Sequence, residues 1–153
     1  MSLTRFHDAQ ESRWSGYATA LGEMRAGRKD SHWIWYIFPQ LDGLGRSSAA
    51  REYALRDLDE ACAYLRDPVL RQRYEEIAEA VAEHVSRGAP IEQFMGGSID
   101  AYKLVSSLTL FRAAANRLGP DYARLAQTCD AILERTAAQG YPPCAFTLEQ
   151  CAH

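Results

Sequence analysis

Residues 27–40 combine large aromatic side chains with polar side chains that can contact a ligand. Lys29, His32 and Gln40 flank the apolar run Trp33-Ile34-Trp35-Tyr36-Ile37-Phe38. Such a run can provide apolar walls and a stacking surface, while the flanking groups donate hydrogen bonds to a bound molecule. In the alternative interpretation, the aromatic residues fill the hydrophobic core, and His32 is satisfied by a backbone carbonyl in the core or at a helix cap.

A glycine-containing loop follows at residues 41–48. Gly45, Arg46 and Ser47 can offer a backbone amide, a positive charge and a hydroxyl to an anion at the N-terminus of a following helix. The loop matches neither the Rossmann nor the P-loop pattern, and Gly43-Leu44-Gly45 is also typical of an ordinary turn. The loop therefore indicates an anion site only in combination with other residues.

Three polar side chains share one face of a helix that we expect over residues 98–118. Asp100, Lys103 and Ser107 recur at helical spacing, so they project roughly one above another, and Ser106 flanks them. An exposed Asp100–Lys103 ion pair of small energetic value is the alternative interpretation.

We expect Lys29, His32, Gln40 and Lys103 to converge on one site, because packing alone seldom requires so many bulky donors beside aromatic residues. His32 and Asp100 are the candidate catalytic residues, since an imidazole or a carboxylate with a tuned pKa can act as a general acid or base. Gln10 also has a simpler interpretation, as a buried glutamine that ties two elements together. The candidate ligand-binding residues are Gln10, Lys29, Trp33, Gln40, Gly45, Arg46, Ser47, Lys103 and Ser107.

Two functions are consistent with this set. In the first, the protein binds or hydrolyses a small anionic, ring-containing molecule, such as a nucleotide or an ADP-ribose derivative. Lys29, Arg46 and Lys103 would neutralise phosphate, and Trp33 or Trp35 would stack on a base. In the second, the protein is a non-enzymatic helical interaction module whose polar cluster holds the core together. An exposed apolar patch, rather than a concave polar pocket, would distinguish this module from a ligand-binding protein.

The elements that must position these residues are predicted to be α-helices. Asp67-Pro68 is a typical helix start, Ser98 is an expected N-cap, and Gly119-Pro120 is a typical helix end. Apolar residues that recur at steps of three and four predict helices over residues 68–87, 98–118 and 121–138.

Shorter helical segments are predicted before these. An amphipathic pattern over residues 3–24 ends at Gly27, and a capping box at Asp57 begins a short helix. The aromatic run 33–38 suits a strand by composition. We favour a short buried helix there, because polar N-cap residues precede the run and Pro39 closes it. The expected fold is all-α, with one domain over residues 1–153 and about six to eight helices.

Composition limits the partners of this domain. The chain has 153 residues, 47% apolar and 24% charged, which is typical of one soluble globular domain. A net charge of −3 and a pI of about 5.8 argue against a nucleic-acid partner. The longest apolar run, residues 33–38, is too short to span a membrane, and the first residues lack a signal-peptide pattern. We therefore expect no membrane partner and a cytoplasmic location.

Cysteine and histidine usage gives no metal signature. The four cysteines form no C-x-x-C pair, and without an export signal we expect them to be reduced thiols. The histidines are scattered, so we expect no metal site and no cofactor. A small anionic ligand is the partner that the residues indicate, and the oligomeric state does not follow from them.

Five motifs that span nearly the whole chain carry a family resemblance. They are Phe6 with Ala9-Gln10, Lys29-x-x-His32-Trp33-x-Trp35-x-x-Phe38-Pro39-Gln40, Gly43-Leu44-Gly45-x-Ser47, Glu60-Ala61-x-x-Tyr64-Leu65 and Asp100-x-x-Lys103-x-x-Ser106-Ser107-x-Thr109-Leu110-Phe111. In these motifs the chain resembles the bacterial family catalogued as domain of unknown function 1810. The resemblance implies a mainly helical single domain and no established activity. One position departs from the family pattern: an acidic residue is expected three before Thr147-Leu148, and Cys144 stands there.

Overall fold

The structure, a computed structural model, describes residues 3–152 and contains no β-strand in that range. An isolated parallel bridge pairs Leu41 with Leu55. The predicted all-α class is confirmed, but this range holds ten α-helices rather than six to eight, together with one short 3₁₀ helix, η1. The elements are α1 Thr4–Gln10, α2 Tyr17–Ala26, α3 Ile34–Ile37, α4 Ser48–Glu52, α5 Leu58–Arg66, α6 Pro68–Ser86, α7 Ile91–Met95, α8 Ser98–Leu118, η1 Pro120–Tyr122, α9 Ala123–Ala138 and α10 Ala145–Cys151.

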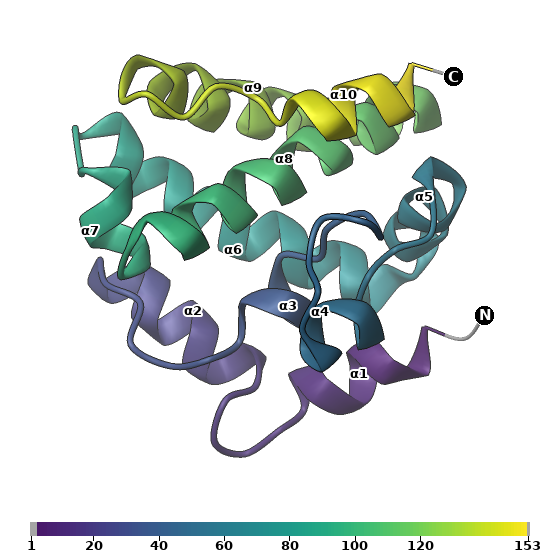
Figure 1. Ribbon diagram of the computed structural model, residues 1–153, viewed down its shortest axis with the longest axis horizontal. Coiled ribbons are helices and arrows are strands. Elements are labelled where there is room, and N and C mark those ends of the chain that lie inside the picture. Colours follow the sequence, from purple (N-terminus) through teal and green to yellow (C-terminus); the bar gives the residue numbers. More distant parts are fainter. Residues whose placement is uncertain (1–2, 153) are drawn as a thin grey trace.

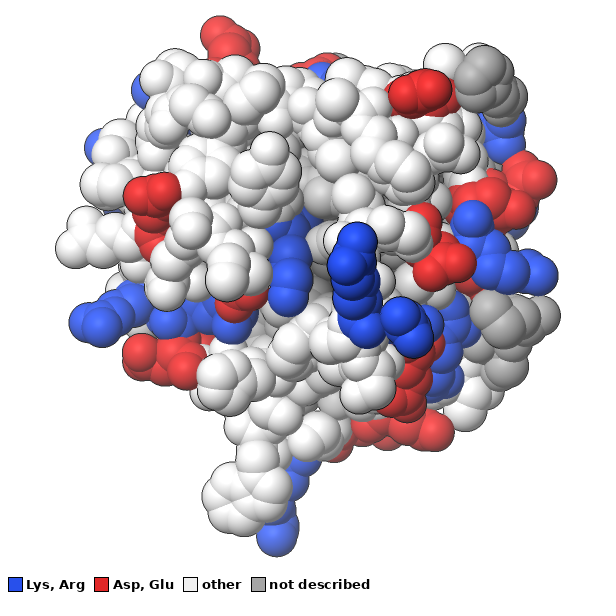
Figure 2. Space-filling view, in the orientation of Figure 1, with Lys and Arg blue, Asp and Glu red and all other residues white. Residues whose placement is uncertain are grey.

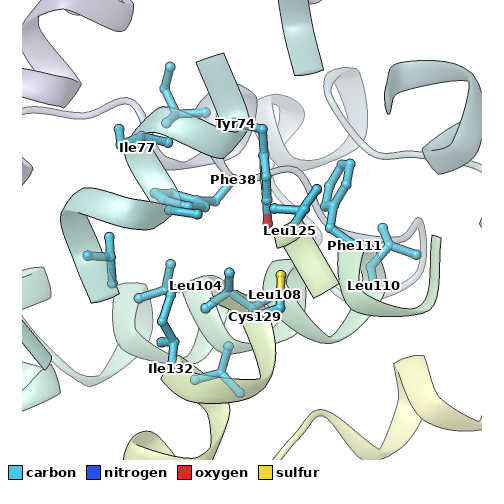
Figure 3. Packing of buried hydrophobic residues seen from close by; sticks show 14 of the residues in the cluster. Phe38, Tyr74, Ile77, Leu104, Leu108, Leu110, Phe111, Leu125, Cys129 and Ile132 are labelled. Atoms are coloured by element: carbon cyan, nitrogen blue, oxygen red, sulfur yellow. The ribbon is translucent and has the colours of Figure 1, made fainter. Parts of the chain in front are cut away.

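The long helix α8 runs through the middle of the fold (Figure 1) and packs against α5, α7, α9 and α10. Figure 3 shows side chains from α6, α8 and α9 meeting around Phe38, which follows α3. The rings of Tyr74 and Phe111 lie with their centres 4.2 Å apart in this core. Because α3 also contacts α8, the core holds the aromatic segment beside the helix that carries Lys103.

The three long predicted helices are confirmed as α6, α8 and α9. Asp67 caps α6, since its carboxylate accepts hydrogen bonds from the backbone N–H groups of Val69 and Leu70. The N-cap of α8 is Gly97, not the predicted Ser98, which is the first residue of the helix. Gly97 has a φ of 145°, a conformation that glycine adopts without the steric cost of a Cβ atom.

The predicted N-terminal helix over residues 3–24 is wrong as one element, because α1 ends at Gln10 and α2 begins at Tyr17. The break contains the buried Gly16, where an added Cβ would lie 2.2 Å from the carbonyl oxygen of Ser12. The chain therefore folds back tightly on itself and leaves Trp14 81% exposed. Both helices bury residues in the same core, so the apolar period continues across the break and conceals it.

The shorter predicted helices are also found. The aromatic run forms the buried helix α3, and the helix expected after Asp57 is α5, with Asp57 accepting a hydrogen bond from the Glu60 N–H. The helix expected after the loop 41–48 is α4. The helices α7 and α10 were not predicted, because segments of five to seven residues contain too few positions to show a period. Within residues 3–152, no helix has both the length and the apolar character required to cross a membrane.

Candidate functional site

A cavity of about 310 Å³ lies between α3, the N-terminal half of α8, the start of α10 and the segment that carries α4. Figure 2 shows this side of the molecule, where Lys and Arg side chains border a hollow among mainly uncharged residues. The volume lies at the lower end of the range for small-molecule sites. The apolar part of the wall includes Ile34, Phe38, Leu41, Leu44 and Ile99.

Residues 42–54, which we call the cover segment, form one side of the cavity. Two backbone hydrogen bonds of 2.8 Å hold its ends together, from the Asp42 N–H to the Leu55 carbonyl and from the Leu55 N–H to the Gln40 carbonyl. None of residues 42–54 is buried. The cover segment is therefore a surface loop with closely joined ends, of the kind that often carries function.

Lys103 reaches the cavity from α8. Its Nζ lies 5.0 Å from the centre of the Trp35 ring, a distance at which the ring face attracts an ammonium group. The Lys103 side chain makes no hydrogen bond or ion pair with any residue from 3 to 152. Its positive charge is thus available to an anion that enters the cavity.

Two buried polar atoms of residues lining the cavity have no hydrogen-bond partner in the described part of the chain. They are the Oγ of Ser106, a residue only 2% exposed, and the indole Nε1 of Trp35. An unsatisfied buried polar group costs about 1–3 kcal/mol, so each atom gains from a hydrogen-bonding ligand. Tyr53 adds a phenol to the wall, and burial together with the neighbouring Glu52 raises its pKa, which keeps the hydroxyl protonated.

Lys29 and Asp100, both predicted site residues, pair with each other and do not line the cavity. The Nζ of Lys29 lies 2.8 Å from Asp100 Oδ2 and donates to the Ser31 carbonyl at 2.6 Å. The same ammonium lies 4.8 Å from the centre of the Trp33 ring. The Asp100 carboxylate is therefore engaged in an ion pair, one turn of α8 before Lys103.

His32, the other candidate acid or base, is exposed and does not line the cavity. Its imidazole makes no hydrogen bond or ion pair with the residues that the structure describes. Of the four residues expected to converge, Gln40 and Lys103 line the cavity, whereas Lys29 and His32 lie outside its wall. The described residues also contain no cluster of three or more metal-ligating side chains.

Three predicted ligand-binding residues belong to the core. Trp33 is fully buried, and its indole N–H donates to a carboxylate of α2. Ser107 is fully buried, and its hydroxyl is bonded to a tyrosine hydroxyl of α6. Gln10 is buried and donates to the Tyr36 carbonyl at 2.9 Å and to the Tyr64 hydroxyl at 3.0 Å. The contacts of Ser107 and Gln10 join elements that are distant in the sequence, and the contact of Trp33 joins α2 to the segment that follows it.

The predicted loop residues lie in the cover segment. Gly45 lines the cavity, and an added Cβ there would lie only 2.5 Å from the Cβ of Ala50. Ser47 caps α4 by accepting a hydrogen bond from the Ala50 N–H at 3.1 Å. The Arg46 side chain is exposed and forms no ion pair with a described residue.

The predicted ligand-binding set omitted several residues of the wall, including Tyr53, Ser106, which the sequence places beside the predicted polar face, and Cys144, which stands at the position that departs from the family pattern. The spacing of Ser106 could have revealed it, because a residue three positions after Lys103 lies on the same helix face. Ser107 turns instead toward the core. Cys144 precedes α10, and no local pattern places it beside α8.

These features define an all-helical protein with a small, mainly apolar cavity that presents an ammonium, a hydroxyl and an indole N–H. The family model described as "Protein of unknown function (DUF1810)" matches residues 1–138, and the chain belongs to this family. The family predicted from the motifs is thus confirmed. The match extends through α9 and includes the wall residues described above except Cys144.

The chain is also similar to a solved structure, the crystal structure of the conserved hypothetical protein Rv1873 from Mycobacterium tuberculosis. The two chains are 36% identical, with a TM-score of 0.82, over 99% of this chain and 96% of that chain. No match was found among curated proteins. The similarity supports the helical fold along nearly the whole chain.

Proposed function

We propose that the protein binds a small ring-containing molecule with an anionic group in the cavity between α3, α8 and the cover segment. The observation that carries this proposal is the Ser106 hydroxyl, which is buried beside the cavity without a hydrogen-bond partner in the described chain. A hydroxyl that serves only packing is normally hydrogen-bonded when it is buried. An incoming polar group would satisfy it.

The other polar groups of the wall define what that incoming group must be. The Trp35 indole N–H can only donate a hydrogen bond, and the Lys103 ammonium can only donate. Both therefore require an acceptor, and the positive charge of Lys103 favours an anionic one. The aromatic and aliphatic side chains around them favour a ring or another apolar body.

The proposal is binding rather than hydrolysis. The sequence predicted a nucleotide or ADP-ribose derivative that is bound or hydrolysed, with His32 or Asp100 as the acid or base. Among the residues that the structure describes, no side chain lining the cavity carries a carboxylate or an imidazole. The two predicted acid–base residues, His32 and Asp100, do not line the cavity, and a general acid or base must lie within hydrogen-bond reach of the reacting group, directly or through one water.

A second candidate function is a protein-interaction module. Ile99 and Tyr102 line the cavity and are 72% and 64% exposed, and Phe146 of α10 is 36% exposed. This arrangement provides apolar surface for a partner. We favour ligand binding, because a docking surface does not require a buried unpartnered hydroxyl and a lysine without a counter-ion.

Thermal unfolding with a panel of ring-containing anions tests the proposal; the panel includes cyclic carboxylates, nucleoside monophosphates, NAD and ADP-ribose. We expect at least one compound to stabilise the protein, by about 2.7 kcal/mol at 100 times its Kd. Ser106→Ala should weaken that effect. Ser107→Ala is the matched control, since the neighbouring serine faces the core and its loss should leave binding unchanged. A panel without any stabilising compound, or equal binding by the Ser106→Ala variant, would overturn the proposal.

A further inference from the structure

We infer that the ligand of this cavity is an aromatic or cyclic monocarboxylic acid rather than a nucleotide. The inference rests on the proposed function and narrows its ligand class. It follows from the charge of the wall, the number of donors and the apolar character of the remaining surface.

The cationic groups of the cavity wall can neutralise a single negative charge on the ligand. Lys103 is the only cationic residue among the described residues that line it. Lys29 is paired with Asp100, and the Arg46 side chain is exposed rather than part of the wall. A pyrophosphate would bring at least two negative charges, and a buried charge without a partner is strongly unfavourable. A carboxylate brings one charge, which Lys103 can neutralise.

The donors of the wall also suit a carboxylate. Lys103 and Ser106 are three residues apart on α8, so they share a helix face, and the Trp35 ring lies next to the Lys103 ammonium. An ionised carboxylate has two oxygens that together accept several hydrogen bonds. It can therefore accept from the ammonium, the Trp35 indole N–H and the Ser106 hydroxyl, all of which lack a hydrogen-bond partner in residues 3–152.

The apolar part of the wall disfavours a ribose, whereas Gln40, Tyr53, Ser98 and Tyr102 supply polar side-chain atoms elsewhere in it. Phe38, Leu41, Leu44 and Ile99 offer no hydrogen-bonding side-chain atoms, so sugar hydroxyls placed against them would lose water without replacement. An unsubstituted ring makes favourable contact with the same surface. The volume of about 310 Å³ suits one or two rings with a short acidic arm better than a dinucleotide.

Titration calorimetry on the full chain with matched acid and amide probes tests this inference. The acids are phenylacetate, trans-cinnamate and indole-3-acetate; each is compared with its primary amide, and AMP and ADP-ribose are measured in parallel. We expect at least one acid to bind at least tenfold more tightly than its amide and than either nucleotide. Lys103→Met should reduce the acid-to-amide ratio to about one while the amide still binds, and Ser107→Ala should preserve the ratio.

The possible failures are distinguishable. Tighter binding of AMP or ADP-ribose than of every acid would overturn the monocarboxylate inference and leave the proposed function standing. Equal binding of acid and amide by the parent protein would also overturn the inference. Absence of binding by all acids, amides and nucleotides would overturn the inference together with the proposed function.

Discussion

The Nζ of Lys29 lies 2.8 Å from Oδ2 of Asp100, and this ion pair joins the segment after α2 to the first turn of α8. Lys103, one turn further along α8, has no counter-ion among residues 3–152. Two lysines that look equivalent in the sequence therefore differ in role. The first is held in a buried ion pair within the scaffold, and the second is available to a ligand.

Removing Asp100 should destabilise the fold. Asp100→Ala leaves the ammonium of Lys29, whose side chain is 5% exposed, with the Ser31 carbonyl as its hydrogen-bond partner. We expect the free energy of unfolding to fall by about 3 kcal/mol, because breaking a buried pair strands a charge. Urea denaturation measures the loss. Lys29→Met strands no buried cation, so its loss of unfolding free energy should be smaller than that of Asp100→Ala. An equal or larger loss in Lys29→Met would show that the stranded Lys29 charge is not the cause.

Replacing Lys103 should leave stability nearly unchanged. Lys103→Ala removes a charge without an ion-pair partner in the described chain, and we expect its free energy of unfolding to stay within about 1 kcal/mol of the parent. Trp33→Ala is the contrast, because this fully buried side chain leaves a cavity that costs about 3–5 kcal/mol. Chemical denaturation of both variants measures the two losses of unfolding free energy. A Lys103→Ala loss as large as that of Trp33→Ala would mean that Lys103 is structural.

Acid should weaken the fold through Glu23 and Asp67. Burial alone would raise the pKa of Glu23, but hydrogen bonds from Ser31, Asp30 and Trp33 outweigh it and hold the pKa below its usual value. Burial of Asp67 is likewise outweighed by hydrogen bonds that include one from a histidine, and its pKa is also lowered. A lowered folded-state pKa contributes stability above the unfolded-state pKa, and that contribution is lost as the pH falls through the folded-state value.

We therefore expect the free energy of unfolding to decrease as the pH is lowered below about 4. Glu23→Gln should be less stable than the parent at pH 7 and should show a shallower decrease in acid. Denaturant unfolding between neutral and acidic pH measures both slopes. If the free energy of unfolding falls with decreasing pH equally in the parent and in Glu23→Gln, Glu23 is excluded as a source of the acid sensitivity.

A side chain at Gly45 should alter the cavity more than the core. In Gly45→Ala the new Cβ would lie 2.5 Å from the Cβ of Ala50, so the cover segment must shift. We expect ligand binding to weaken at least tenfold. The free energy of unfolding should fall by less than about 1 kcal/mol, because none of residues 42–54 is buried.

Gly22→Ala is the matched control for that variant. Gly22 lies inside α2, and nothing lies within 4 Å of an added Cβ there. Alanine should stabilise the helix by about 1 kcal/mol and leave ligand binding unchanged. The affinities of Gly45→Ala and Gly22→Ala for the same ligand are measured and compared. Equal affinities would show that the cover segment does not shape the cavity.

The long helices could be predicted because their apolar stripes are local. Helices α6 and α9 each bury one face, so the three- and four-residue period appears directly in the sequence. The middle of α8, from Leu104 to Phe111, is buried on all sides, and its apolar residues still recur at helical spacing. The break between α1 and α2 could not be predicted in the same way. Gly16 is buried against the backbone of its own loop while both flanking helices face one core, and the period is preserved across the turn.

The candidate site was predictable only in part. Gln40 and Lys103 were expected in the site because each is a polar side chain within a segment that otherwise serves packing, and both line the cavity. His32 fits the same local pattern but is exposed outside the cavity wall. Ser106 and Ser107 are adjacent and identical in type, yet one faces the cavity without a partner in the described chain and the other is bonded in the core.

The sequence by itself determined the helical class, the helices α6, α8 and α9, and the segments from which the cavity is built, because local spacing decides which face of a helix is apolar. Only the tertiary structure decided which polar groups remain available to a ligand. Asp100 neutralises Lys29 across 71 positions of sequence, and no residue described by the structure neutralises Lys103. A charge is neutralised by whatever lies within a few ångströms of it in space, and packing of the helices sets that distance.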